Sequence, residues 1–149
     1  MMTAILTTET GLPPIRLESI TAGGDCAVLR VAGEVDVCTA PQLREHMIHL
    51  VDGGARYIIA DLRDVTFLDS TGLGALIGGL KRLRACEGSL QLVITADQIL
   101  RIFLVTGLDH VFALRPSVQE AVTTDQHWQA TVTGEGHTAA QWCRRHGLP

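Results

Sequence analysis

Apolar residues along the chain follow two periods, one typical of strands and the other typical of helices. Short apolar runs predict strands at 15–20, 26–31, 57–62, 90–95 and 111–114. Apolar residues that recur every three or four positions predict helices that begin near residues 40, 70, 97 and 118. Strands that alternate with helices indicate an α/β fold with right-handed crossovers. We therefore expect a mixed, mostly parallel sheet of four to five strands with about four helices.

The periodic part of the chain, residues 15–123, is expected to fold as one domain. At 149 residues, 46% of them hydrophobic, the chain is long enough to bury one good core. Residues 1–14 are rich in threonine and end in prolines, which is typical of a flexible leader. The regular pattern is lost after residue 123. Residues 124–149 are therefore expected to form a C-terminal tail that is poorly ordered or partly helical, with a helical turn around 139–144.

Two segments carry the signals that start a helix. The order Thr-Ala-Pro-Gln predicts a capping box in which Thr39 accepts a hydrogen bond from the amide of Gln42. The polar residues 33–38 before it are expected to form a loop. Further along, Asp69 or Ser70 is expected to cap the next helix, because a short oxygen-bearing side chain accepts from the unpaired amides of a first turn.

The helix that begins near Ser70 has leucines on one face and glycines on another. Each interior glycine costs about 1 kcal/mol of helix propensity relative to alanine, so Gly74, Gly78 and Gly79 together cost roughly 3 kcal/mol. Two explanations stay open. A neighbouring element of the same domain packs closely against the glycines, or a partner protein docks on this face beside Ser70.

Composition and charge narrow the classes of partner. A net charge of -4 and a pI near 5.8 argue against a phosphate-backbone partner, and an aromatic content of 4% argues against base stacking. No charged block or long apolar segment predicts membrane binding, and residues 1–10 lack the pattern of a secretory signal. We expect a cytoplasmic protein that binds other proteins, with no nucleic-acid or membrane partner.

The cysteines and histidines form no convincing set of metal ligands. The four cysteines are far apart and form no Cys-x-x-Cys pair: Cys26, Cys38, Cys86 and Cys143. His46 and His49 share a helix face, and the tail brings His137, Cys143 and His146 close in sequence. Neither group has a third and fourth ligand in register, so no metal or cofactor is predicted.

The glycines also resemble a nucleotide-binding loop. Gly72, Gly74 and Gly78 begin such a pattern, and Asp97 follows the next strand where a ribose-binding acid lies in dinucleotide folds. In those folds the glycines follow the strand directly, whereas residues 63–69 are expected to intervene here. The chain also lacks the P-loop and G-x-S-x-G patterns. We expect a protein that is not an enzyme, and a dinucleotide enzyme is the least favoured alternative.

Three motifs together resemble a known family. They are Gly33-Glu34-x-Asp36-x-x-Thr39-Ala40, Phe67-Leu68-Asp69-Ser70-Thr71-Gly72-Leu73-Gly74 and Gly107-Leu108-x-x-x-Phe112. Their order and spacing resemble the STAS domain family and, more narrowly, the bacterial anti-sigma factor antagonists. The resemblance covers about residues 15–123, and its second motif is the most specific.

The resemblance implies a phosphorylation switch at Ser70. An anti-sigma factor with serine kinase activity would phosphorylate Ser70, and a PP2C-type phosphatase would reverse the reaction. The unphosphorylated protein would bind the anti-sigma factor and release the sigma factor, and phosphorylation would abolish binding. The docking surface is then expected to comprise Glu34, Asp36, Asp69, Ser70, Thr71, Gly72, Gly74 and Gly78.

Two further points follow from the same resemblance. We expect a monomer or a weak dimer without a bound cofactor. The alternative function within this family is a STAS module that senses a nucleotide or another small ligand and has no phosphorylation switch.

Overall fold

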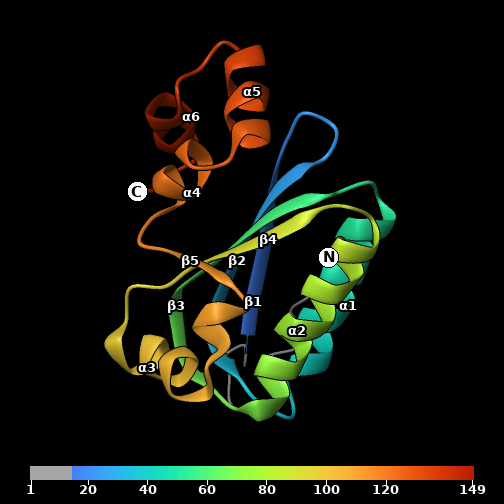
Figure 1. The fold of residues 1–149 in the computed structure, drawn as a ribbon, viewed down its shortest axis with the longest axis vertical. Helices are drawn as coiled ribbons and strands as arrows, with labels where there is room; N and C mark the ends of the chain where they lie inside the picture. The colour runs from blue at the N-terminus through green and yellow to red at the C-terminus, as the bar shows by residue number, and fades with distance from the viewer. Residues whose placement is uncertain (1–14) are drawn as a thin grey trace.

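The computed structural model describes residues 15–149, so the predicted leader lies outside the described residues. Its strands form a single sheet in the order β1-β2-β3-β4-β5 (Figure 1). The first pair is antiparallel and the other three pairs are parallel, so the predicted mixed, mostly parallel sheet is confirmed. The strands are β1 (Ile15–Ala22), β2 (Cys26–Val35), β3 (Tyr57–Leu68), β4 (Ser89–Val93) and β5 (Ala113–Arg115).

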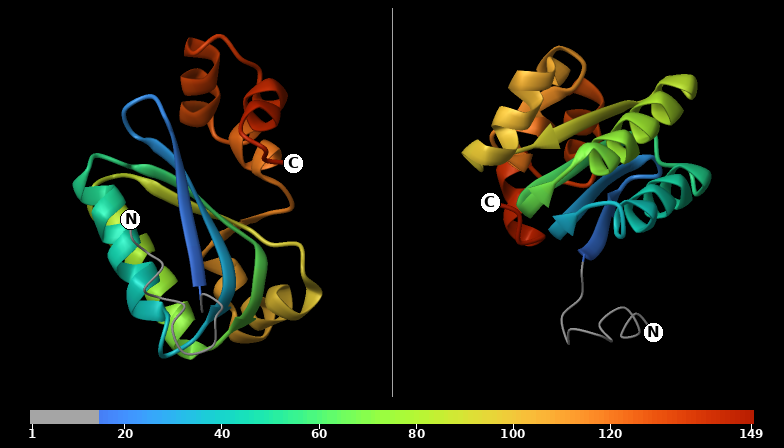
Figure 2. Two further views of the ribbon diagram at one scale, coloured as in Figure 1. Left: turned by 180° about the vertical axis from the view of Figure 1, so that it is seen from behind. Right: turned by 90° about the horizontal axis from the view of Figure 1, so that it is seen from below.

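Six α-helices are present in this part of the chain, where about four were predicted. They are α1 (Ala40–Asp52), α2 (Ser70–Ala85), α3 (Asp97–Thr106), α4 (Val118–Thr123), α5 (Gln126–Gly134) and α6 (Ala139–Arg145), with a short 3₁₀ helix, η2 (Leu108–His110), after α3. Figure 2 shows α1 and α2 on one side of the sheet and the C-terminal helices on the other. The sheet is therefore the middle of three layers.

Alternation along the strands supplies a core to each face of the sheet. In β2, Ala27 and Leu29 pack into the cluster that includes residues of α1, α2 and α3, whereas Val28 packs into the cluster of α4, α5 and α6. In β3, Ile58 faces the first cluster and Ile59 faces the second. Both faces of the central strands are thus buried, which explains why these strands are continuous apolar runs.

The pairing of β2 with β3 shifts register twice near the end of the sheet that leads into α2. The first shift lies between Arg30 and Ala32, and the second lies between Gly33 and Glu34. At each shift β3 contains one residue more than β2, which is the definition of a bulge. Inward-facing residues of β3 are consequently three apart here, at Leu62, Val65 and Leu68.

These bulges explain two errors in the predicted boundaries. The strand predicted to end at residue 62 continues to Leu68, and Glu34, expected in a loop, belongs to β2. The bulges break the strict alternation on which a strand prediction relies. Since β3 leads directly to Asp69, the objection that residues 63–69 separate the glycines from their strand was wrong.

Of the two forms expected for the C-terminal tail, poorly ordered or partly helical, the structure shows the helical one. Residues 126–134 and 139–145 are helices, and the helical turn predicted around 139–144 is α6. Trp128 and Trp142 are fully buried, with ring centroids 5.5 Å apart in an edge-to-face arrangement. A reciprocal capping box between Thr138 and Gln141 begins α6.

None of the helices in residues 15–149 has the combination of length and hydropathy that a membrane crossing requires.

Candidate functional site

Asp69 builds the start of α2. Its Oδ1 accepts hydrogen bonds from the amides of Thr71 and Gly72 at 2.9 and 3.0 Å. The amide of Asp69 donates to the carbonyl of Val35 at 3.2 Å, which joins the start of α2 to the end of β2. Of the two N-caps that the sequence allowed, the structure therefore selects Asp69.

Ser70 is the first residue of α2, and it is exposed. Within residues 15–149 its hydroxyl makes no hydrogen bond, whereas the neighbouring Thr71 is only partly exposed. The two amides of the first turn that could bind an anion are already bonded to Asp69. The Ser70 hydroxyl is thus accessible to another protein, and the fold does not depend on it.

Gly72 and Gly79 are explained by close packing inside the domain. A Cβ at Gly72 would lie 2.6 Å from Cδ1 of Leu68 and 2.8 Å from Cγ1 of Val35. A Cβ at Gly79 would overlap the end of the Met47 side chain, which reaches over from α1. The first of the two explanations for the glycines therefore applies to these two positions.

Gly74 and Gly78 differ, because both are exposed and a Cβ at either would meet nothing within 4 Å. Ser70, Gly74 and Gly78 are spaced four residues apart, so they form one row along the exposed side of α2. Packing among the described residues does not require glycine at these two positions. Docking of a partner stays the prediction for this row.

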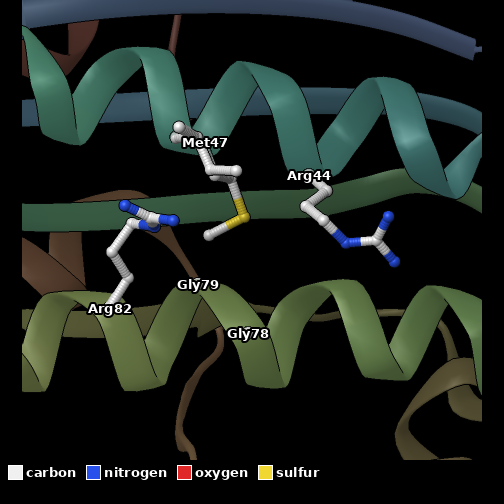
Figure 3. Close-up of a pocket in the computed structure, with 6 residues that line it drawn as sticks. Arg44, Met47, Gly78, Gly79 and Arg82 are labelled. Carbon is white, nitrogen blue, oxygen red and sulfur yellow. The ribbon is translucent and has the colours of Figure 1, made fainter.

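A groove of about 110 Å³ lies between α1 and α2. Figure 3 shows Met47 reaching from α1 toward α2, with Arg44 and Arg82 on either side. Arg82 follows Gly78 by four residues, so the groove continues the row that begins at Ser70. Two arginines and four uncharged residues line it: Arg44, Met47, Ile48, Gly78, Gly79 and Arg82.

Glu34 and Asp36 lie at the end of β2, at the same edge of the sheet as the start of α2. Glu34 is exposed and is the register partner of Phe67. Asp36 is half-buried, and its Oδ1 accepts from the amides of Cys38 and Thr39 at 2.9 and 3.1 Å. Asp36 therefore shapes the turn that leads into α1, in addition to any role on the surface.

The capping box predicted for Thr39 and Gln42 does not form. Thr39 has helical dihedral angles, with φ -104° and ψ -22°, and makes no side-chain cap. Its hydroxyl donates to the carbonyl of Glu34 at 2.7 Å and accepts from the amide of Asp36 at 2.9 Å. Thr39 is buried, so it holds the Glu34 to Asp36 segment in place instead of capping α1.

Two exposed apolar side chains near this edge were not selected from the sequence. Val37 is 66% exposed and Phe67 is 47% exposed. Val37 follows Asp36 in the turn before α1, and Phe67 pairs with Glu34. Val37 was expected in the polar loop 33–38, and Phe67 was part of the second motif without a role on the surface. The register of β2 with β3 places Phe67 beside Glu34, two residues before the start of the α2 cap.

A family model for the STAS domain matches residues 19–121. This stretch is more than half of the chain and contains α1, α2 and the end of the sheet that carries Glu34 and Ser70. The chain belongs to the STAS domain family. The family that the three motifs predicted is thereby confirmed.

Relatives and solved structures agree with this STAS assignment. The chain is 41% identical over 83 residues to the anti-sigma-B factor antagonist of Bacillus subtilis (strain 168), covering 56% of this chain and 75% of the relative. It is 40% identical over 80 residues to the anti-sigma-B factor antagonist of Staphylococcus aureus (strain NCTC 8325 / PS 47), covering 54% and 74%. The crystal structure of an anti-sigma factor antagonist from Mycobacterium paratuberculosis aligns with a TM-score of 0.68 and 31% identity, covering 74% and 92%.

The STAS match ends before α5, and a group of potential ligands lies where α5 meets the hairpin of β1 and β2. The ligand atoms of Asp25, Cys26 and His127 all lie within 4.8 Å of one another. The histidine and cysteine groups suggested by the sequence do not form such a cluster within residues 15–149.

Burial raises the pKa of the Cys26 thiol to about 12, so it is protonated near neutral pH and is no activated nucleophile.

Proposed function

We propose that this STAS protein is an anti-sigma factor antagonist controlled by phosphorylation of Ser70. In this proposal the unphosphorylated form binds an anti-sigma factor and releases the sigma factor. The observation that carries it is the exposed Ser70 hydroxyl on the first turn of α2, beside amides that Asp69 has already capped. The anti-sigma-B factor antagonists that share about 40% identity with the chain support the choice of partner.

The geometry at Ser70 explains how a phosphate would block binding without unfolding the protein. A phosphate adds about 1.5 to 2 negative charges at neutral pH. Because Asp69 occupies the amides of Thr71 and Gly72, the fold offers the phosphate little direct hydrogen bonding at the helix end. The helix dipole offsets only about 0.3 to 1 kcal/mol of the added charge, and Asp69 opposes it. The phosphate therefore stays at the surface, where a docked partner has to cover it.

Burying the phosphate charge in an interface costs more free energy than the helix dipole contributes. Glu34, Asp36 and Asp69 already make this edge of the sheet acidic. An unpaired charge buried in an interface, or one that faces like charge, costs several kcal/mol. The cost falls on the complex and not on the free protein, so phosphorylation should abolish binding while the fold persists.

The proposed docking surface extends from the end of β2 along α2. It includes the carboxylates of Glu34 and Asp36, the residues around Ser70, and the exposed glycines Gly74 and Gly78. Val37 and Phe67 add exposed apolar area at its edge. Asp69, Thr71 and Gly72 support this surface through the cap and the packing of the first turn.

The switch requires two enzymes as partners. In our proposal the anti-sigma factor is itself the serine kinase, and a PP2C-type phosphatase regenerates the free hydroxyl. In this proposal the protein contributes the acceptor hydroxyl of Ser70, and the two partners contribute the catalytic groups.

The decisive experiment incubates the protein with its kinase partner and labelled ATP. We expect one phosphate in the wild-type protein and none in Ser70→Ala. Thr71→Val is the matched control, because it removes the adjacent hydroxyl and should leave phosphate uptake unchanged. Undiminished uptake by Ser70→Ala, with native circular dichroism, would refute the assignment to Ser70.

A charge substitution tests the binding half of the proposal. Ser70→Glu places a carboxylate where the phosphate would lie, and we expect the anti-sigma factor to bind at least tenfold more weakly, which corresponds to about 1.4 kcal/mol. Ser70→Gln is the matched control of similar size without charge and should bind more tightly than Ser70→Glu. Equal affinities of the two variants for the anti-sigma factor would contradict an electrostatic switch.

Neither the groove between α1 and α2 nor the start of α2 favours the alternative of a nucleotide sensor. The groove between α1 and α2 holds about 110 Å³, whereas small-molecule sites usually enclose about 300 to 1,000 Å³. The capped amides at the start of α2 also leave less hydrogen bonding for a nucleotide phosphate.

A further inference from the structure

The junction between the β1–β2 hairpin and α5 brings together three different types of metal ligand. Asp25 and Cys26 lie at the start of β2, and His127 lies in the first turn of α5. Nε2 of His127 is 2.9 Å from Oδ1 of Asp25, and Sγ of Cys26 is 3.8 Å from the same oxygen. All three ligand atoms lie within 4.8 Å of one another.

The two separations that involve Asp25 are close to those of a tetrahedral zinc site. With Zn–S near 2.3 Å and Zn–N and Zn–O near 2.0 to 2.1 Å, neighbouring ligand atoms lie about 3.3 to 3.6 Å apart. The His127 to Asp25 distance would need to open slightly from 2.9 Å, and the Cys26 to Asp25 distance would need to close slightly from 3.8 Å. Both changes are a few tenths of an ångström, within the reach of side-chain rotation.

Neighbouring residues hold the ligands in this arrangement. The ring of Tyr57 stacks on the His127 imidazole, with centroids 3.9 Å apart and planes at 19°. Oγ1 of Thr131 lies 3.6 Å from the Cys26 sulfur and donates to the carbonyl of His127 at 2.8 Å. The stacking restricts rotation of the His127 ring, and the Thr131 hydroxyl lies beside the Cys26 sulfur.

We propose that Asp25, Cys26 and His127 form a site for a divalent transition-metal ion of the Zn²⁺ class, with a water molecule as the fourth ligand. On binding the ion, the Cys26 thiol would release its proton to solvent. The resulting thiolate and the His127 imidazole favour Zn²⁺ over the hard cations Mg²⁺ and Ca²⁺. Asp25 and His127 are each more than a third exposed, which provides a path for the ion and room for the water. The ion would fasten α5 to the hairpin.

The site joins two parts of the chain that the STAS match treats differently. Asp25 and Cys26 lie inside residues 19–121, and His127 lies beyond them. A separate hydrogen bond, from the amide of Gly23 to Oε2 of Glu135 at 2.8 Å, holds the hairpin to the other end of α5. The metal would therefore stabilise an existing contact between hairpin and helix. This inference is independent of the proposed function at Ser70.

The test titrates the reduced, chelator-treated, untagged full chain with Co²⁺ and with Zn²⁺. We expect one equivalent of Co²⁺ to give a thiolate-to-cobalt charge-transfer band and the visible bands of a four-coordinate ion. Zn²⁺ should displace the Co²⁺ and raise the melting temperature. Cys26→Ser should remove the charge-transfer band and weaken Zn²⁺ binding at least tenfold, whereas Cys143→Ser, at the other buried cysteine, should change neither.

His127→Gln keeps the test decisive if Cys26→Ser fails to fold, because His127 is partly exposed and its loss leaves the buried thiol in place. This variant loses the contact with Asp25 and the stacking on Tyr57, so it should fold but melt below wild type without metal. It should also lose the Zn²⁺-dependent rise in melting temperature. Two results would overturn the proposal. One is the absence of stoichiometric Co²⁺ or Zn²⁺ binding by the wild-type chain, and the other is unchanged binding in His127→Gln.

Discussion

The two faces of the sheet are covered by different kinds of side chain. Under α1, α2 and α3 the core is largely aliphatic, and its aromatic residues are Phe103 and Phe112. Under α4, α5 and α6 the core centres on Trp128 and Trp142. Two polar side chains, Asp61 in β3 and Gln91 in β4, are buried on this second face, and each residue is 4% exposed.

The buried polar groups of the second face are paired, apart from the indoles. Asp61 accepts two hydrogen bonds from the guanidinium of Arg63, at 2.8 and 2.7 Å. Gln91 donates to the carbonyl of Ala121 at 3.0 Å and accepts from Arg115 at 2.7 Å. Within residues 15–149 the indole nitrogens of the two tryptophans have no partner. Each unpaired donor costs about 1 to 3 kcal/mol.

The two faces have different proposed roles. The aliphatic face carries the proposed switch on α2, whose outer side has exposed glycines at Gly74 and Gly78. The tryptophan face fastens helices that lie beyond the STAS match at 19–121. If this division holds, damage to the second face should change stability without changing the affinity of the first face for its partner.

The largest expected effect comes from Trp142→Ala. Removing a fully buried tryptophan costs about 3 to 5 kcal/mol, because it leaves a cavity against Trp128. Urea unfolding measures this loss. Anti-sigma factor binding, measured at low temperature where the variant is folded, should stay within about twofold of wild type if the faces are independent.

Trp142→Phe is the matched control for this variant. It keeps an aromatic ring and removes the unpaired indole donor, so its cost should be well below that of alanine. A loss of binding in both variants, in proportion to their loss of stability, would show that the two faces are coupled.

The next effect is expected at Gly72 on the first face. In Gly72→Ala the new methyl group would lie 2.8 Å from Cγ1 and 3.0 Å from the carbonyl oxygen of Val35. Overpacking of this kind costs about 1 to 3 kcal/mol, reduced by up to about 1 kcal/mol of gained helix propensity. Because this strain lies under the first turn of α2, binding should weaken together with stability, unlike the outcome for Trp142.

Gly78→Ala should have the opposite effect on stability. A Cβ there meets nothing within 4 Å, so the protein should gain up to about 1 kcal/mol in the free energy of unfolding. If the row from Ser70 is a docking surface, the same methyl group should weaken anti-sigma binding. Gly134→Ala, at the end of α5 and also in open space, controls for propensity alone. Unchanged affinity in Gly78→Ala would remove Gly78 from the surface.

The smallest effect concerns pH. Burial, and secondarily the charge of His49, lower the pKa of His46 below its ordinary value of 6.5. The unfolded chain then binds a proton more readily than the folded protein does. The stability linked to this group is therefore present above about pH 6.5 and is lost as the pH falls through the lowered pKa. Urea unfolding from about pH 8 to 5 should show a shallower decline in His46→Gln.

The sequence predicted the central architecture because apolar periodicity reports burial directly. The strands at Cys26 and Tyr57 and the helix at Ser70 are continuous apolar or amphipathic segments, and all three were placed correctly at their starts. The cap at Asp69 also followed from residue chemistry, although the sequence could not choose between Asp69 and Ser70. That choice depends on the extended backbone of Asp69, with φ -107° and ψ -173°.

The missed features depend on contacts that local periodicity does not report. Asp25 and His127 are 102 positions apart, and nothing local marks them as neighbours. Thr39 has a capping sequence, but the carbonyl of Glu34 competes for its hydroxyl. The packing of Trp128 on Trp142 stabilises two short helices whose own periodicity is weak. The docking role of Gly74 and Gly78 stays a prediction.

The bulges in β3 make the length of that strand a functional constraint. Thr66 is the extra residue of the second bulge, so deleting it would restore strict alternation from Val65 to Leu68 and would leave Phe67 and Leu68 on their present sides. The strand would nevertheless be shorter by roughly 3.4 Å, which would displace the start of α2. Deletions between Arg63 and Asp69 should therefore be rejected, because they would pull the start of α2 away from the carbonyl of Val35 at the end of β2.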